Sequence, residues 1–188
     1  MANAGSDIVA GIVIRPAIAD DIAALERLIA GSARALSKGF YDDRETEAAI
    51  AHVFGVDSEL IADGTYFVAE AGGSLAGCGG WSRRRTLFGG DRFAARDAGL
   101  LDPTVDAARI RAFFTAPGWQ RRGIAARLLR TCETAAARAG FTRMALMATL
   151  PGMPFYAAHG YRPDAPIEQD CGGVAVRFTP MTKELLQA

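Results

Sequence analysis

The 188-residue sequence has few residues of the kinds that form disulfides or zinc sites. Its three cysteines, Cys78, Cys132 and Cys171, lie far apart, and no Cys-x-x-Cys pair occurs. An odd number of widely spaced cysteines fits neither a disulfide framework nor a zinc site. We therefore expect no bound metal and reduced thiols, as in a cytoplasmic protein.

Long apolar runs and net charge are also absent. No run approaches the ~18 apolar residues of a membrane span, and residues 1–7 lack the basic start and apolar stretch of a signal peptide. Lys+Arg and Asp+Glu both number 21, and this balance argues against nucleic acid as a partner. The run Arg83-Arg84-Arg85 could bind nucleic acid or an acidic substrate, but at a strand end it is more often a solvated edge. The sequence predicts a cytoplasmic protein without a membrane partner.

What is present is the balance of an ordinary globular protein, with 50% apolar and 22% charged residues. A chain of this length fits one domain with one sizeable core. We expect residues 1–188 to form a single domain in which 1–7 is a disordered tail.

Apolar periodicity predicts an alternation of strands and helices. β-branched or alternating runs predict strands at 11–16, 65–70, 75–84, 108–115, 144–148, 161–162 and 174–178. Helical spacing predicts helices at 20–36, 46–53, 122–140 and 153–158. The segment 89–106 is unusually long for a connection and is expected to be a functional loop or lid. This order is typical of a mixed α/β sheet.

A predicted strand and helix meet at the turn Gln120-Arg121-Arg122-Gly123-Ile124-Ala125. The start of a helix leaves N–H groups unpaired and carries about half a positive charge, so it can bind a diphosphate. Gly123 has no Cβ, which lets phosphate oxygens approach the backbone. Taken alone, such a turn is more often a glycine near an N-cap beside solvated arginines. The flanking strand and amphipathic helix favour an anion site, and the G-x-x-x-x-G-K-[ST] pattern of nucleoside triphosphate loops is absent.

This turn resembles the Q/R-x-x-G-x-G/A motif of the GNAT superfamily of acyl-CoA N-acyltransferases, matched at Gln120, Gly123 and Ala125. A later segment, Phe155-Tyr156-Ala157-Ala158-His159-Gly160-Tyr161, resembles the F-Y-x-x-x-G-F/Y motif of the same family. Two separated motifs in the right order are more specific than either alone.

The resemblance implies the GNAT fold, which is α/β (α+β). It is a twisted mixed sheet of about seven strands, with helices on both faces, splayed between strands 4 and 5 by the cofactor. The implied activity is direct transfer of an acetyl group from acetyl-CoA, as co-substrate, to a primary amine on a small molecule or a protein. The family analogy also suggests a homodimer. The alternative within this fold is a regulatory module that binds acyl-CoA without turnover.

The resemblance also implies which residues bind CoA. The strand before the turn would pair with the pantetheine arm, and the backbone amides of the turn would bind the pyrophosphate. Thr149 stands where the family often has an asparagine that contacts pantetheine, which is a departure from the family pattern. The predicted cofactor-binding residues are Phe113, Phe114, Thr115, Gln120, Arg121, Arg122, Gly123, Ile124, Ala125, Ala126 and Thr149.

Tyr156 matches the tyrosine that, in the family, points its hydroxyl at the CoA sulfur. A thiol has a pKa of ~8.5 and tyrosine one of ~10, so the phenol can donate a hydrogen bond or a proton as the C–S bond breaks. The alternative is a helix residue that packs beside Phe155. The general base is left open among Asp102, Asp106 and His159, although aspartates on a solvated loop are more often turn residues.

Overall fold

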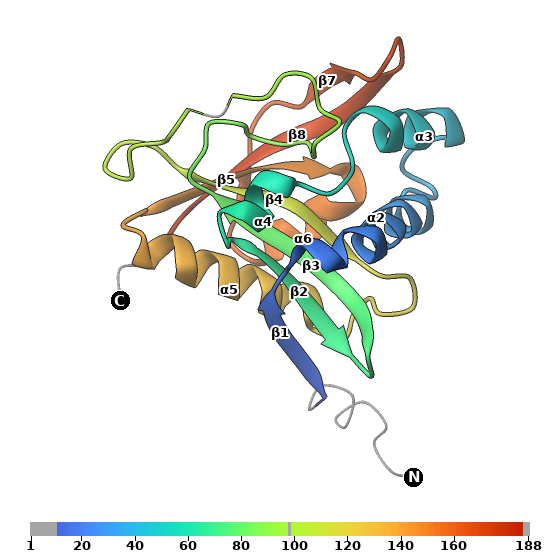
Figure 1. Cartoon of the computed structure of the whole chain (residues 1–188). Coiled ribbons are helices and arrows are strands. Elements are labelled where there is room, and N and C mark those ends of the chain that lie inside the picture. The colour runs from blue at the N-terminus through green and yellow to red at the C-terminus, as the bar shows by residue number, and fades with distance from the viewer. Residues whose placement is uncertain (1–10, 98, 186–188) are drawn as a thin grey trace.

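The computed structural model describes residues 11–97 and 99–185 (Figure 1). The predicted disordered segment 1–7 lies outside these residues. The strands are β1 (Ile12–Pro16), β2 (Tyr66–Ala71), β3 (Ser74–Ser82), β4 (Ala108–Thr115), β5 (Arg143–Thr149), β6 (Arg162–Pro163), β7 (Ile167–Asp170) and β8 (Ala175–Glu184). The helices are η1 (Ala19–Asp21), α2 (Ile22–Leu36), α3 (Asp43–His52), α4 (Ser58–Ala62), α5 (Ile124–Arg138), η2 (Leu150–Gly152) and α6 (Met153–Ala158).

The strands form one sheet in the order β1-β2-β3-β4-β5-β8-β6, with β7 paired to β8. All neighbours are antiparallel except β4 and β5, which are parallel. The β2–β3 hairpin turns at Gly72 and Gly73, whose φ angles of 57° and 75° suit the tight turns that join twisted strands. The predicted mixed α/β fold with about seven strands is confirmed.

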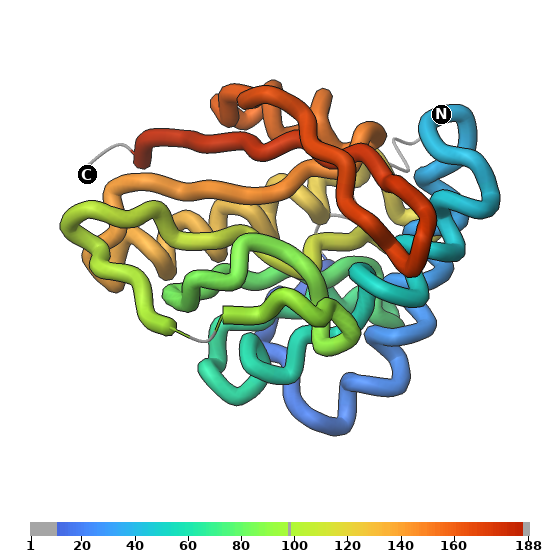
Figure 2. Tube along the Cα trace, turned by 90° about the horizontal axis from the view of Figure 1, so that it is seen from above, coloured from blue at the N-terminus to red at the C-terminus, as the bar shows by residue number. Residues whose placement is uncertain are grey.

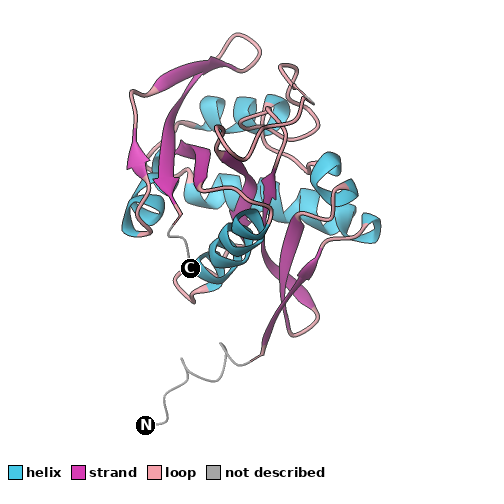
Figure 3. Cartoon of the chain, turned by 90° about the vertical axis from the view of Figure 1, so that its left-hand side faces the viewer, coloured by secondary structure: helices cyan, strands magenta, loops and turns pink. Residues whose placement is uncertain are grey.

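Helices cover both faces of the sheet (Figure 3). Successive side chains of a strand point to opposite faces, and β2 shows the consequence. Val68 belongs to a core cluster with Leu25 and Ile29 of α2, whereas Ala69 belongs to one with Leu128 of α5. Each amphipathic helix therefore buries its apolar side against one face of the same strands.

The sheet opens between β4 and β5, as predicted. Their parallel pairing covers only Ala108–Ile110 of β4 and ends where Ile110 faces Leu146. Just beyond this point the register of β4 against β3 shifts, which is a β-bulge. Ala112 in the bulge has a φ of 49°, and the Tyr66 hydroxyl donates to its carbonyl at 3.1 Å. The bulge turns the second half of β4 away from β5.

Several boundaries differ from the sequence prediction. The second long helix begins at Asp43 rather than at 46, because Asp42 and Glu45 form a reciprocal capping box. Neither α4 nor β7 was predicted, and β8 runs to Glu184 rather than ending at 178.

The strand predicted over 75–84 ends at Ser82, and beyond it Arg84 forms an isolated bridge with Leu100. The predicted solvated edge at Arg83–Arg85 is therefore partly a structured contact, since Arg84 also pairs with Asp63 at 2.8 Å.

The β7–β8 hairpin lies beside α3, far from it in sequence (Figure 2). The Tyr41 hydroxyl, just before α3, donates to the Arg177 carbonyl at 2.6 Å. This hydrogen bond joins β8 to the segment that precedes α3. Across residues 11–97 and 99–185, no helix has the length and apolar character needed to cross a bilayer.

Candidate active site

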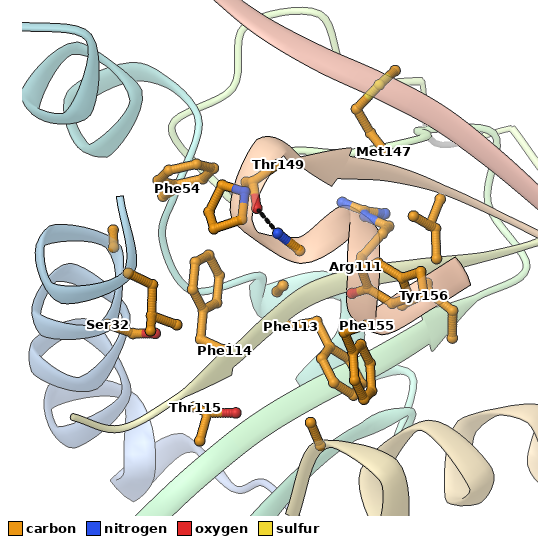
Figure 4. Close-up of a pocket in the computed structure, with 18 of the residues that line it drawn as sticks. Ser32, Phe54, Arg111, Phe113, Phe114, Thr115, Met147, Thr149, Phe155 and Tyr156 are labelled. Carbon is orange, nitrogen blue, oxygen red and sulfur yellow. Dashed lines mark hydrogen bonds between the residues drawn. The ribbon is translucent and has the colours of Figure 1, made fainter. Parts of the chain in front are cut away.

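A pocket of about 620 Å³ occupies the opening between β4 and β5 (Figure 4). On one face of the sheet it is lined by the first turn of α5 and the turn before it. On the other face it is lined by α2, the segment after α3 and residues 88–90. Among the predicted site residues, only Arg122 lies outside the lining of this pocket. The structure thus brings together two motifs that are about 30 residues apart in the chain.

The turn before α5 has an unusual backbone. Arg121 and Gly123 both have left-handed φ angles, of 60° and 75°. The first hydrogen bond into the helix runs from the Arg127 N–H to the Gly123 carbonyl at 3.0 Å, so the N–H groups of Gly123 through Ala126 have no helical acceptor. Successive N–H groups in such a conformation form a concave anion site.

Gly123 is therefore favoured by its backbone conformation, whereas close approach of a phosphate stays a prediction. A Cβ added there would meet no atom within 4 Å, but the positive φ would strain any other residue. Gln120 supports the same turn, since its side-chain oxygen accepts the Gly118 N–H at 2.9 Å. Arg122 stacks on Trp119, with its guanidinium 4.9 Å from the ring centroid. Contact between Arg122 and a cofactor stays a prediction.

The second half of β4 places alternate side chains on the two sides of the opening. Phe113 points toward Phe155 and Tyr156, with ring centroids 6.3 and 6.2 Å away. Phe114 points to the other side, 5.5 Å from Phe54. A Cβ on Gly79 would lie 2.2 Å from the Phe113 ring, so only glycine lets that ring take this position. The edge of β4 that faces the opening can pair with an extended ligand.

Tyr156 lies in α6 at the same opening and is 8% exposed. Its ring packs against Phe155 and Tyr161, with centroids 5.1 and 5.6 Å away. Within the described part of the chain, its hydroxyl has no hydrogen-bond partner. Burial raises the pKa of Tyr156, so the phenol stays protonated at neutral pH and can donate a hydrogen bond. The ring is thus held by packing while the hydroxyl remains available.

Thr149 caps the short turn that leads into α6. Its Oγ1 accepts the Gly152 N–H at 3.3 Å, drawn as the dashed line in Figure 4. A hydroxyl that accepts one hydrogen bond still has its own hydrogen to donate. Thr149 can therefore offer a donor to the pocket where the family often has an asparagine.

None of the three candidate bases lines the pocket. Asp102 accepts from the Thr104 N–H and Oγ1 at 2.9 and 2.7 Å, and these bonds lower the pKa of Asp102. Asp106 accepts the Asp102 N–H at 2.8 Å, so both aspartates are turn residues. His159 has its Nδ1 2.8 Å from the Phe155 carbonyl. Among the lining residues that the structure describes, there is no Asp, Glu, His or Lys.

A buried ion-pair network lies beside the pocket, and the sequence analysis did not predict it. Arg111, on β4, pairs with Asp57, and both side chains are fully buried. Arg96 pairs with Asp57 at 3.0 Å and with Glu59 at 2.5 Å. Arg111 and Arg96 also donate to the carbonyls of Gly89 and Gly90, at 3.2 and 2.8 Å.

The network fixes residues 89–90 against β4. Burial raises the pKa of Asp57 and lowers the pKa of Arg111, while the attraction between them opposes both shifts. The segment predicted as a lid is thus anchored where it lines the pocket. The signal in the sequence was an arginine inside the apolar strand Ala108–Thr115, because a buried charge requires a partner.

Comparison with known proteins identifies the family. The model of the acetyltransferase (GNAT) family matches residues 29–161. A search of curated proteins found no match.

Several solved structures share the fold. A GCN5-related N-acetyltransferase from Rhodopseudomonas palustris has a TM-score of 0.69 at 21% identity, covering 92% of this chain and 95% of that one. The PaiA N-acetyltransferase from Thermoplasma acidophilum, in complex with coenzyme A, has a TM-score of 0.62 at 16% identity, covering 92% of this chain and 98% of that one. YncA, a putative acetyltransferase from Salmonella typhimurium with acetyl-CoA, has a TM-score of 0.59 at 17% identity, covering 95% of this chain and 96% of that one. Because the family model spans most of the chain, this protein belongs to the acetyltransferase (GNAT) family and is an N-acetyltransferase.

Proposed function

We propose that the protein transfers the acetyl group of acetyl-CoA directly to a primary amine of a small molecule or a protein. The observation that carries this proposal is the single pocket that runs through the opening between β4 and β5. It joins the anion-binding turn on one face of the sheet to a separate subsite on the other. Two substrates can therefore meet at the opening without a covalent enzyme intermediate.

The residues on the α5 side fit CoA. The N–H groups of Gly123 through Ala126 would bind the pyrophosphate at the positive end of α5, and Arg121 lines the same region. The free edge of β4 would pair with the amides of the pantetheine arm, beside Phe113 and Thr115. The names of two structural neighbours, PaiA with coenzyme A and YncA with acetyl-CoA, support this assignment.

Tyr156 would protonate the departing thiolate. Its hydroxyl has no hydrogen-bond partner among the described residues, and burial raises its pKa, so the proton is present and can first be donated as a hydrogen bond to the sulfur. The chain's cysteines do not provide a covalent route, because Cys78, Cys132 and Cys171 are all buried and none lines the pocket. Backbone N–H groups near the β4 bulge would polarise the thioester carbonyl.

The test is thiol release from acetyl-CoA with a panel of amines, beside a calorimetric titration with CoA. We expect CoA binding, and thiol release that depends on an amine. CoA binding without thiol release from any amine, small or peptidic, would favour the regulatory module. No binding of CoA would refute both. The cytoplasmic location and the homodimer stay predictions, and gel filtration with light scattering tests the latter.

A further inference from the structure

The side of the pocket that faces α2 has a strongly aromatic lining. Phe54, Phe88, Phe114 and Phe178 all line it. Phe54 lies 5.5 Å from Phe114 and 6.1 Å from Phe178, and Phe88 lies 5.7 Å from Phe178, measured between ring centroids. These rings come from four different parts of the chain and converge on one subsite. Figure 4 shows Phe54 and Phe114 facing this space, with Ser32 of α2 beside them.

Among the lining residues that the structure describes, none is negatively charged. The charged residues that line the whole pocket are Arg111 and Arg121, both positive. The remaining polar side chains there are hydroxyls, one amide, the indole of Trp119 and the phenol of Tyr156. A protonated amine entering this subsite would lose water and find no carboxylate in return.

Four carboxylates on α2, α4 and the segments beside α4 interact with arginines. Asp57 pairs with Arg111 and Arg96, and Glu59 with Arg96. On the α2 side, Glu26 pairs with Arg92 at 2.5 Å and accepts the Val56 N–H at 3.0 Å. A further acid, Asp91, accepts from Ser58 and lies 3.9 Å from Arg96. All four lie outside the pocket lining, so they stabilise its walls rather than a bound cation.

Such a subsite favours an amine that is neutral before it binds. An alkylamine with a pKa near that of lysine, ~10.4, is neutral in only about one molecule in 10³ at pH 7.4. Burial away from anions disfavours the charged form, so the subsite takes up the amine in its neutral form. An amine attached directly to an aromatic ring delocalises its lone pair into the ring, and is therefore neutral at this pH.

We propose that the acceptor is an aromatic amine whose nitrogen is bonded directly to the ring. This inference rests on the proposed acetyl transfer and names the substrate class for the subsite formed by Phe54, Phe88, Phe114 and Phe178. The nitrogen attacks the thioester carbonyl, the N–C bond forms and the C–S bond breaks. The electron pair of the C–S bond leaves on sulfur, and Tyr156 gives its proton to that sulfur. The proton lost from nitrogen returns to the Tyr156 oxygen, directly or through water, so no base is consumed.

The experiment compares amines that share a ring but differ in basicity. Thiol release would be measured with aniline and 4-methylaniline, and with benzylamine, 2-phenylethylamine and cyclohexylamine, at pH 6.0–9.0. At pH 7.4 we expect kcat/KM for the aryl compounds to exceed that for 2-phenylethylamine at least about tenfold, because the ~10³ advantage in neutral fraction is partly offset by weaker nucleophilicity. The arylamine rate should be flat from pH 6.5 to 8, and the alkylamine rate should rise about tenfold per unit.

Higher kcat/KM for the alkylamines at pH 7.4 would overturn the acceptor class and leave the proposed function standing. If CoA binds but none of these amines, and no amino acid, polyamine or peptide, supports thiol release, both the acceptor class and the proposed acetyl transfer would be overturned. The two failures are thus distinguishable.

A charge introduced into the subsite gives a second readout. Ser32 is buried, lines the pocket and has no hydrogen-bond partner among the described residues. Ser32→Asp should shift the kcat/KM ratio toward 2-phenylethylamine at least about tenfold, whereas the matched Ser32→Asn should not. If either variant fails to fold, Leu36→Glu and Leu36→Gln replace them, because Leu36 lines the pocket and is 37% exposed. Equal ratios in a folded pair would contradict the electrostatic basis of the proposal.

Discussion

Replacement of Tyr156 by phenylalanine separates a catalytic hydroxyl from a structural ring. The ring is 8% exposed and packs against Phe113, Phe155 and Tyr161, and phenylalanine keeps these contacts. The hydroxyl has no described hydrogen-bond partner, so its removal leaves no donor or acceptor unpaired. We expect the free energy of unfolding to change by less than about 0.5 kcal/mol.

Turnover should respond very differently. If the hydroxyl protonates the departing thiolate, it acts mainly in the transition state, and kcat should fall by roughly 10²–10⁴. In free energy this is about 3–5 kcal/mol of lost transition-state stabilisation. CoA affinity should be nearly unchanged, because the turn at Gly123 and the edge of β4 remain intact.

The assay is kcat for thiol release at saturating acetyl-CoA, with a CoA titration and a thermal melt of both proteins. An unchanged kcat in Tyr156→Phe would remove the hydroxyl from the mechanism. Acceleration would then come from holding the two substrates together. A large loss of stability would instead mean that the hydroxyl has a structural partner.

Three further predictions concern the turn, the ion-pair network and pH. Gly123→Ala and its control Gly118→Ala replace glycines that have φ of 75° and 79° and open space around them, so each variant should lose about 1–2 kcal/mol of stability. Calorimetry should show weaker CoA binding for Gly123→Ala only, and equal CoA affinities in the two variants would place the pyrophosphate elsewhere. Arg111→Met removes one of the two arginines beside the buried Asp57, and urea unfolding should show a destabilisation of about 3–5 kcal/mol. The double variant Arg111→Met with Asp57→Asn should be destabilised less than Arg111→Met alone. A double variant that is less stable than Arg111→Met would refute the pairing. The pKa of Asp21 is lowered, chiefly by its hydrogen bond from Arg15. The stability that ionised Asp21 contributes is therefore complete above the unfolded pKa of ~3.9 and is lost as pH falls through the lower folded pKa. The difference in unfolding free energy between the wild type and Asp21→Asn should shrink below about pH 4, and a difference that stays constant down to pH 2 would contradict the shift.

The sequence predicted the fold where local signals were strong. The helices at 22–36 and 124–138 have continuous apolar stripes, and the glycine pair 72–73 fixes a hairpin. The turn at Gly123 was predictable because a motif, a strand and a helix coincide within a few residues. Its left-handed backbone at Arg121 was not, since an arginine gives no sign of a positive φ.

The side of the pocket that faces α2 could not be predicted, because it is assembled from distant segments. Phe54, Phe88, Phe114 and Phe178 are each ordinary apolar residues in sequence, and only the sheet order brings them together. The candidate bases Asp102 and Asp106 lie outside the pocket lining for a local reason. Asp102 and Asp106 are close to β4 in the chain, but their side chains bond to their own turn. Burial of Asp57 depends on Arg111, 54 positions later, and no local pattern announces such a pair.

The central claim is that acetyl-CoA and an amine react together in the pocket between β4 and β5. Initial rates of thiol release, measured while both substrates are varied and matched to the acetylated amine by mass spectrometry, test it most directly. We predict double-reciprocal lines that intersect, with one acetylated amine formed per thiol released, as expected for a ternary complex. Parallel lines, which indicate an acyl-enzyme intermediate, or thiol release without acetylated amine would contradict the account.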